Sequence, residues 1–272
     1  SLFINTLPWC NMLKNSNQTS DMLTRNSTRK SKSDPVAPDS VLVDALSGFS
    51  LDPRRSYTAQ VHAVLQQAIV RGKLLPKTAL SEATIASLIE VSRTPVREAL
   101  AQLADEQLVL IYRQVGTIVA PVRLSLLEEG RFVRSTLECA NHVQLAQNIT
   151  TEQLTEFGQI IQRQRDAVSN GRLDQYSELD ELMHKRLFEF AGREHVWPML
   201  EPFKRQFDRV RWLLLGVSGH AERSLREHEQ ILAQMAARDV AGLGATVAAH
   251  INHITQHLAA LREQAPAAYF VD

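Results

Sequence analysis

The amino-acid sequence predicts a mainly α-helical protein, with an N-terminal winged helix-turn-helix followed by an all-α helical bundle. Its 272 residues suffice for two domains. Two short β-branched runs follow three helical segments in the first half, and the second half shows only helical periodicity. We expect a disordered tail over 1–53, the winged helix-turn-helix over 54–123, the helical bundle over 124–264 and a C-terminal tail over 265–272.

Composition and charge separate the two domains. Hydrophobic residues at 44% and charged residues at 22% are ordinary for a globular protein. The net charge is zero, but residues 54–123 hold nine Lys and Arg against five Asp and Glu, residues 1–53 balance at five and five, and the remainder carries −4. A basic module before an acidic one indicates that only the first meets a polyanion.

Cellular location follows from cysteine usage and hydropathy. The only cysteines are Cys10 and Cys139, which indicates reduced thiols and a cytoplasmic protein. No apolar run approaches the length of a membrane span, so we expect no membrane partner. No secretory signal is recognisable at the N-terminus, so we do not expect export.

Helical periodicity begins near Tyr57, after a stretch of Asn, Ser, Thr and Lys with little apolar pattern. The apolar positions that share one helix face are Val61, Val64, Leu65, Ala68 and Ile69. This helix should end near Gly72, and Ser81 should open a short second helix after a turn at Pro76.

The third helix and the wing follow directly. Ser92 is a favourable N-cap, and Pro95 falls in the first turn, where its missing N–H has no cost. The period then changes, because residues 108–112 and 117–122 are short β-branched runs around Gly116. We expect a hairpin there.

The second half is predicted as about six helices between Leu124 and Arg262. Every segment is long enough for several helical turns, and none alternates with a period of two. Breaks are expected near Asn148, Gly171, Gly192, Gly219 and Asp239. Such a series forms an all-α bundle.

The predicted third helix has side chains suited to reading DNA. Arg93 and Arg97 are four residues apart on one helix face, and guanidinium pairs with guanine O6 and N7 in the major groove. Ser92 and Thr94, with the N–H groups of the first turn, can hold phosphates. Gly116 would let the wing backbone approach DNA closely. Each feature alone is also typical of a solvated surface or a turn; together they favour DNA binding.

Two stretches carry a resemblance to a known family. Leu80-Ser81-Glu82, followed by Val91-Ser92-Arg93-Thr94-Pro95-Val96-Arg97-Glu98-Ala99-Leu100, resembles the signature of GntR-type bacterial transcription regulators. The resemblance covers about residues 57–122. It implies that Arg93 and Arg97 read bases, that Ser92 and Thr94 hold phosphates, and that Gly116 lies in the wing.

The sequence departs from this family pattern at four positions. Lys77, Glu90 and Gln107 stand where glycine is common in the family. A non-glycine residue in a left-handed turn costs about 1 kcal/mol, so we expect slight strain in this domain. Ala83 stands where many relatives carry a basic residue that contacts DNA, so the usual operator half-site is not implied.

Histidines concentrate in the helical half, which holds eight of the nine. Asp180 and His184 are four residues apart on one helix, and His228 and His250 lie on the last two helices. Three imidazoles and a carboxylate from three helices suit a divalent ion such as zinc or nickel. The pattern leaves alternatives, because His253 and His257 compete with His250, and single histidines are commonly surface or hydrogen-bonded core residues.

A second resemblance concerns this half. Asp180 and His184 with Leu187, Glu227-His228 with Ile231, and His250 after Val247 resemble the effector domain called FCD, in its six-helix VanR-like variant. The resemblance covers about residues 124–261. It implies an all-helical domain that binds a metal beside a carboxylate effector, with the metal ligands Asp180, His184, His228 and His250.

Arg134 matches a position from which relatives reach into the effector pocket. A buried guanidinium would hold a carboxylate by two hydrogen bonds. An ion pair with Glu138, four residues on, explains Arg134 equally well. Arg131, Arg209 and Arg211 are weaker effector-binding candidates, which we expect on the surface.

These observations predict a metabolite-responsive bacterial transcription regulator, a repressor rather than an enzyme. It would bind operator DNA as a homodimer and respond to a small carboxylate beside the metal. One alternative is a metal-dependent enzyme fused to a DNA-binding module. Glu181 and Glu227, the acids next to predicted ligands, should however point to helix faces different from those of the ligands, so no general base stands out. Another is a purely structural metal in a dimerisation module.

Overall fold

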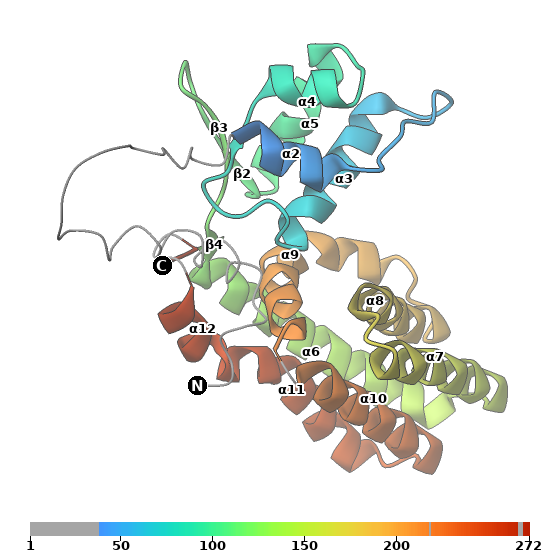
Figure 1. The fold of residues 1–272 in the computed structure, drawn as a ribbon. Helices are drawn as coiled ribbons and strands as arrows, with labels where there is room; N and C mark the ends of the chain where they lie inside the picture. The colour runs from blue at the N-terminus through green and yellow to red at the C-terminus, as the bar shows by residue number, and fades with distance from the viewer. Residues whose placement is uncertain (1–37, 218, 266–268) are drawn as a thin grey trace. The chain divides into compact units, whose positions relative to one another are not determined.

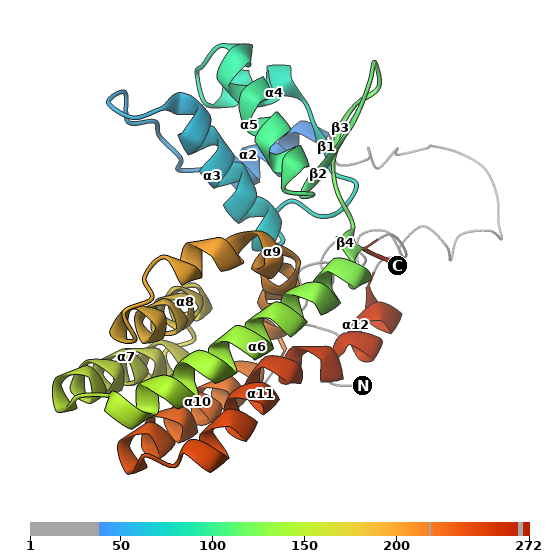
Figure 2. The ribbon, with the colours of Figure 1, turned by 180° about the vertical axis from the view of Figure 1, so that it is seen from behind.

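The structure is a computed structural model that describes residues 38–217, 219–265 and 269–272. The chain forms two compact units. Of the described residues, one unit comprises those up to Val122 together with residues 265 and 269–272, and the other comprises those from Arg123 to Gln264. Figures 1 and 2 show the ribbon from opposite sides.

The first unit is a winged helix-turn-helix with one additional helix at its start. Its three strands are antiparallel in the order β1-β3-β2, with Leu110 opposite Ile118 in the hairpin. The hairpin was predicted, whereas the two-residue strand β1 was not. The elements are α2 (Pro38–Leu46), α3 (Tyr57–Val70), β1 (Ala79–Leu80), α4 (Glu82–Leu88), α5 (Arg93–Asp105), β2 (Val109–Tyr112) and β3 (Gly116–Val119).

Serines begin the three helices of the helix-turn-helix. The Ser56 hydroxyl accepts a hydrogen bond from the backbone N–H of Ala59, and the Ser81 hydroxyl accepts one from Thr84. These bonds satisfy backbone donors that the first helical turn leaves unpaired. Ser92 occupies the N-cap position of α5, as predicted, but its side chain makes no capping hydrogen bond.

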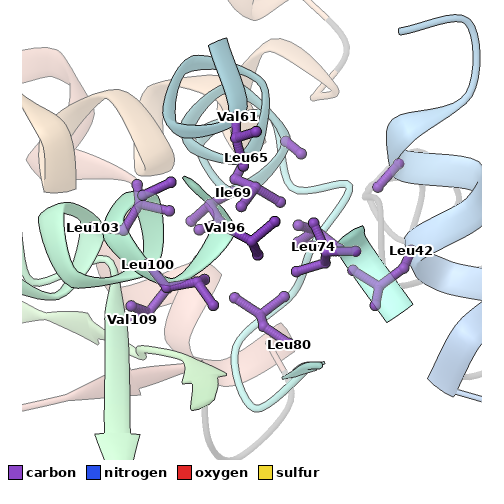
Figure 3. Close-up of a cluster of buried hydrophobic side chains, with 14 of the residues drawn as sticks. Leu42, Val61, Leu65, Ile69, Leu74, Leu80, Val96, Leu100, Leu103 and Val109 are labelled. Atoms are coloured by element: carbon purple, nitrogen blue, oxygen red, sulfur yellow. The ribbon is translucent and has the colours of Figure 1, made fainter. Parts of the chain in front are cut away.

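An apolar core holds this unit together (Figure 3). The inward faces of α3 and α5 meet there, as the periodicity predicted, and the sheet closes the core. The buried side chains include Val61, Leu65, Ile69, Leu74, Leu80, Ile85, Val96, Leu100, Leu103, Val109 and Val119.

Helix α2 also contributes to this core. The disordered tail predicted for residues 1–53 was therefore wrong for the part that forms α2. Leu42 is 1% exposed, and Ala45 and Leu46 are also buried. Their spacing of three and four residues is helical, but the run is too short to stand out beside the polar stretch before it. The predicted tail up to residue 37 lies outside the described residues.

The three positions where the sequence departs from glycine all have left-handed backbones. The φ angles are 70° at Lys77, 56° at Glu90 and 59° at Gln107. The prediction of left-handed turns with non-glycine residues is therefore confirmed. Each turn is retained at a steric cost of about 1 kcal/mol.

The second unit is all-helical. The five predicted breaks coincide with its helix ends, and one further break at His257 separates a short last helix. Helix α6 packs against α9 and α11, and α10 packs against α7 and α11 (Figure 2). The helices are α6 (Leu124–Asn148), α7 (Thr151–Ser169), α8 (Leu173–Phe190), α9 (Val196–Leu215), α10 (His220–Ala237), α11 (Val240–Gln256) and α12 (Leu258–Gln264).

The end of the chain differs from the predicted C-terminal tail. Strand β5 (Phe270–Val271) pairs with β4 (Val122–Arg123), and the N–H of Val122 donates to the carbonyl of Tyr269 at 2.8 Å. Tyr269 is 2% exposed, so an aromatic side chain anchors this segment. Within the described parts of the chain, no helix has the length and apolarity needed to cross a membrane.

Candidate functional site

Helix α5 buries one face in the core and exposes the face that carries Arg93 and Arg97. The Arg97 side chain is 70% exposed, and its Nη2 lies 2.9 Å from Oε2 of Glu82, the first residue of α4. Glu82 therefore holds Arg97 across the helix-turn-helix. Sequence reasoning missed this partner because the two residues are fifteen positions apart.

The N-terminus of α5 is open to solvent. Ser92, Arg93 and Thr94 are exposed. The first backbone N–H groups of a helix point outward and favour anions, so this end of α5 suits a phosphate. A shallow groove adjoins it, lined by Pro53, Arg55, Tyr57, Thr58, Ser92, Thr94, Pro95 and Glu98.

The wing is the β2–β3 hairpin. Gly116 has a φ of 140°, a conformation that favours glycine, although an added Cβ would meet no atom within 4 Å. The backbone conformation therefore favours glycine at this position, although the surrounding space would accommodate a side chain. At the tip, Val115 is 85% exposed and Arg113 is also exposed. The structure thus places the predicted DNA-contacting residues of α5 and the wing on the surface of this unit.

In the second unit, the four predicted metal ligands meet inside the bundle. Asp180 and His184 come from α8, His228 from α10 and His250 from α11. The Nε2 atoms of His228 and His250 are 3.3 Å apart. Asp180 Oδ1 lies 3.5 Å from Nε2 of His228 and 4.0 Å from Nε2 of His184.

These separations fit a small divalent ion. Zinc–ligand bonds of about 2.0–2.1 Å place neighbouring atoms of a tetrahedral site about 3.3 Å apart. Nε2 of His184 is buried and has no hydrogen-bond partner among the described residues. A buried nitrogen without a partner beside two other imidazoles and a carboxylate suits a transition metal. His253 and His257, the competing histidines, belong to a separate cluster.

Each of the three imidazoles is oriented by a partner at its other nitrogen. Nδ1 of His228 lies 2.8 Å from Oε1 of Gln164, whose own amide donates to the carbonyl of Leu179. Nδ1 of His250 lies 2.9 Å from Glu227 Oε2. Nδ1 of His184 lies 2.7 Å from Glu138 Oε2. Acceptors at all three Nδ1 atoms favour the tautomer that leaves each Nε2 free to bind an ion.

Glu227 contacts a predicted ligand on another helix, which reasoning within one helix did not anticipate. Glu227 sits one residue before His228 on α10, but its carboxylate reaches the ring of His250 on α11. The faces of one helix say nothing about contacts with a neighbouring helix, such as the contact that Glu227 of α10 makes with α11. Glu181 does face elsewhere, where it accepts hydrogen bonds from Trp197 Nε1 and Lys204 Nζ.

Electrostatics keep Asp180, His228 and His250 in the protonation states that metal coordination would require. Burial raises the pKa of Asp180, but the Arg211 guanidinium outweighs it and holds the pKa well below its usual range. Burial lowers the pKa of His228 and of His250. An ionised carboxylate and neutral imidazoles are the protonation states required for coordination.

Arg134 lies in the bundle and has the ion pair that the sequence allowed. It is 1% exposed, its Nε donates to Glu138 Oε1 at 2.6 Å, and its guanidinium lies 4.8 Å from the centre of the Phe207 ring. Because Glu138 also contacts His184, Arg134 is connected to the metal ligands through one carboxylate.

The surface positions predicted for Arg209 and Arg211 were wrong. Arg209 is 1% exposed. Arg211 is largely buried and pairs with Oδ2 of Asp180. Arginine is usually exposed unless it has a buried partner, and the buried partner Asp180 of Arg211 lies on another helix, α8, where the sequence gives no sign of the pairing.

A small cavity adjoins the ligands. Its volume is about 20 Å³, close to what one water molecule requires. Two guanidinium groups, those of Arg134 and Arg211, line it together with Asp180, His184 and His250. This combination of cations and metal ligands is chemically suited to a small anion.

Comparison with known proteins agrees with this architecture. Residues 57–119 match the model of the bacterial regulatory proteins of the gntR family, and residues 129–253 match the FCD domain. The HTH-type transcriptional repressor RspR of Escherichia coli K12 is 30% identical over 214 residues, 79% of this chain and 94% of RspR. The gluconate operon transcriptional repressor of Bacillus licheniformis is 26% identical over 66% of this chain and 72% of its own length.

Solved structures share the fold. The structure of Escherichia coli McbR/YncC has a TM-score of 0.63 at 23% identity and covers 77% of this chain and 99% of its own. A putative GntR transcriptional regulator from Rhodococcus has a TM-score of 0.59 at 22% identity, with coverage of 76% and 99%. The family and these relatives are transcription regulators rather than enzymes. The chain belongs to the GntR family of bacterial transcription regulators, with an FCD domain after its winged helix-turn-helix.

Proposed function

We propose that this regulator is a repressor that binds operator DNA as a homodimer and is controlled by a small carboxylate bound beside a divalent metal. The observation that carries the proposal is the convergence of four ligand atoms whose imidazoles are each oriented by an outer partner. Repression is supported by relatives in Escherichia coli and Bacillus licheniformis that are named as repressors.

Asp180, His184, His228 and His250 would hold the metal, with zinc or nickel as the ions that suit this donor set. The bound ion would supply a Lewis-acidic position for an oxygen of the effector. Gln164, Glu227 and Glu138 orient the imidazoles, as outer partners do in metal sites.

Arg134 is the proposed effector clamp, and Arg211 is a second cation in the same cavity. Both guanidinium groups already face carboxylates, Glu138 and Asp180 respectively. A cavity of about 20 Å³ is too small for a carboxylate of several carbons. Effector binding would therefore move side chains of α6 or α9, and this movement provides a route to the rest of the protein.

A homodimer is supported by apolar side chains exposed on two helices that pack together, α6 and α9. Phe132 and Leu137 of α6 are 64% and 39% exposed, and Met199 and Phe203 of α9 are 70% and 45% exposed. Exposed large apolar groups on adjoining elements mark a contact surface, and a twofold dimer would present two recognition helices to a pseudo-palindromic operator.

DNA recognition is assigned to Arg93 and Arg97 as base-reading groups, with Ser92, Thr94 and Gly116 near the backbone. The test is binding of the purified protein to its own promoter DNA across a range of salt concentrations, with Arg97→Ala beside wild type. We expect steep salt dependence and a loss of about 1–3 kcal/mol in the preference for operator over unrelated DNA.

The matched control is Arg172→Ala, which removes an exposed arginine from the other unit. It should leave the preference for operator DNA unchanged. If Arg97→Ala retained that preference, the recognition helix would not read bases through this residue, and the proposal would fail.

A purely structural metal is the second candidate. His228 is fully buried, so its loss could also disturb folding. Retained folding with a lost effector response in His228→Ala would argue against a purely structural role. An effector response that survives removal of the metal would favour it.

A further inference from the structure

A second group of histidines lies in the same bundle, at the N-terminal end of helix α10. His220 is the first residue of α10, and His253 and His257 are one turn apart at the end of α11. One ring nitrogen from each lies within 4.8 Å of the other two. We call these residues the second triad. They are separate from the four ligands of the proposed function.

The local backbone brings these side chains together. Gly219 has a φ of 82°, a left-handed conformation, and directly precedes His220. The connection between α10 and α11 is short, with Arg238 and Asp239 between the two helices, so the helices run antiparallel. The start of α10 therefore lies beside the end of α11, and the His220 and His253 rings are 4.9 Å apart between centroids.

Two of the ring nitrogens have the spacing of neighbouring ligands around one ion, and the third lies within 4.8 Å of both. Nε2 of His253 and Nε2 of His257 are 3.0 Å apart. Neighbouring ligand atoms around a zinc or nickel ion are separated by about 3.0–3.3 Å, depending on whether the geometry is octahedral or tetrahedral. Two facing ring nitrogens must share either a proton or a cation, since their lone pairs repel.

An outer partner orients the central ring. Oε1 of Glu227 lies 3.6 Å from Nδ1 of His253, while Oε2 of the same carboxylate contacts Nδ1 of His250. A carboxylate at Nδ1 favours the tautomer that leaves Nε2 of His253 free for a metal. One carboxylate thus lies near a ligand of each cluster, and its Oε1 also accepts a hydrogen bond from Nε of Arg223 at 3.2 Å.

Burial favours coordination over protonation at His220. His220 and His253 are 7% and 2% exposed, whereas His257 is half-buried and reachable from solvent. Burial, with help from the two neighbouring imidazoles, lowers the pKa of His220 to about 3, so this ring is neutral at physiological pH. A site with three protein ligands leaves a position for water or an anion, which can enter beside His257.

We propose that His220, His253 and His257 form a second transition-metal site, linked to the first through Glu227. The chain would then bind two ions. Three imidazoles select zinc, nickel or copper over magnesium or calcium, which prefer oxygen ligands. Because Glu227 contacts both clusters, occupation of one site should change the affinity of the other.

The test is zinc stoichiometry of the full chain after removal of bound metal by a chelator, measured by equilibrium dialysis and elemental analysis. We expect two zinc ions per chain in wild type, one in His257→Gln and one in the double variant His184→Ala/His228→Ala. His195→Gln is the matched control, because the His195 side chain is 94% exposed and should not affect either site.

The outcomes separate this proposal from the proposed function. One zinc in wild type and none in the double variant would overturn the second site and leave the first intact. One zinc in wild type and none in His257→Gln would support the second triad and overturn the first site. Two zinc ions in His257→Gln would also overturn the second triad as a site.

Folding of the variants is checked by thermal unfolding without metal. His257 is half-buried, so His257→Gln should fold. Cobalt provides an independent readout. We expect the visible absorption of Co²⁺ to rise in two steps in wild type and in one step in His257→Gln. A single step at one equivalent in wild type would contradict the proposal.

Discussion

The arginines to which we assign functions lie in opposite environments in the two units. Arg93 and Arg97 are exposed on the winged helix-turn-helix, and the one ion pair of Arg97 with Glu82 lies at the surface. Arg134 and Arg211 of the helical unit are buried and joined to carboxylates. Surface pairs contribute about 0–1 kcal/mol, whereas breaking a buried pair costs about 3–5 kcal/mol. Substitution of Arg93 or Arg97 should therefore affect binding alone, whereas substitution of Arg134 or Arg211 should affect both folding and binding.

The largest expected effect is at Glu138. Glu138→Ala leaves the buried guanidinium of Arg134 without its partner, and we expect the helical unit to lose about 3–5 kcal/mol of stability. Urea unfolding followed by tryptophan fluorescence measures this. Glu129→Ala, an exposed acid on the same helix, should change stability by less than about 0.5 kcal/mol. Similar losses in the two variants would remove the contrast between buried and exposed charges.

The next effect is a pH dependence from His142. Burial lowers the pKa of His142 from 6.5 to about 4, so as the pH falls the unfolded chain binds this proton before the folded chain does. Stability of the metal-free protein should therefore decrease as the pH falls from 6.5 to 4, by about 3 kcal/mol in total from this residue. His142→Leu should flatten the pH profile by that amount, while His195→Leu should not. Parallel profiles for wild type and His142→Leu would show that His142 is not buried as a neutral ring.

A gain of DNA contact is expected from Ala83, which is exposed on α4. Ala83→Arg adds a cation at the start of α4, where the family resemblance implies a DNA-contacting residue. We expect tighter binding to all DNA, with the slope of log K against log salt steeper by about 0.9, as for one added phosphate contact. Stability should change by less than about 0.5 kcal/mol. An unchanged salt slope would show that α4 does not approach the DNA backbone at this point.

The smallest effects are at the left-handed turns. Replacing Lys77, Glu90 or Gln107 by glycine removes the steric cost of a positive φ. It also raises the conformational entropy of the unfolded chain, which offsets part of this gain. The net gain should be about 0.5–1 kcal/mol for each, measured by thermal unfolding. Gln102→Gly, in the middle of α5, should instead destabilise by about 1 kcal/mol. Loss of stability in all three turn variants would show that their side chains make contacts that outweigh the strain.

Local sequence patterns predicted most of the fold. Apolar spacing, serine caps and glycine breaks identified α3 to α11, because these signals act within one helix. Helix α2 was missed because three apolar residues, Leu42, Ala45 and Leu46, are too few to identify a helix from sequence. Their role is apparent only from the core in which they are buried. Strand β1 was missed for the same reason, because its two residues pair with β3, which is distant in sequence.

The candidate metal site shows the same limit. Asp180 and His184 are predictable from their spacing of four residues. Their orienting partners Gln164, Glu227 and Glu138 come from other helices, and no spacing rule connects them. Arg211 was expected on the surface, because its partner Asp180 is 31 positions away. Pairings between helices are fixed by packing and are therefore visible only in three dimensions.

The most direct test of the central claim is the coupling between the two units. Operator affinity of the full chain is measured with and without Zn²⁺ and a panel of small mono-, di- and tricarboxylates, in wild type and in His184→Ala/His228→Ala. We expect at least one carboxylate with zinc to change wild-type affinity by about 5–150-fold, equivalent to about 1–3 kcal/mol, and to leave the variant unchanged. Equal shifts in both proteins, or no shift in wild type with zinc bound, would contradict control of DNA binding by this site.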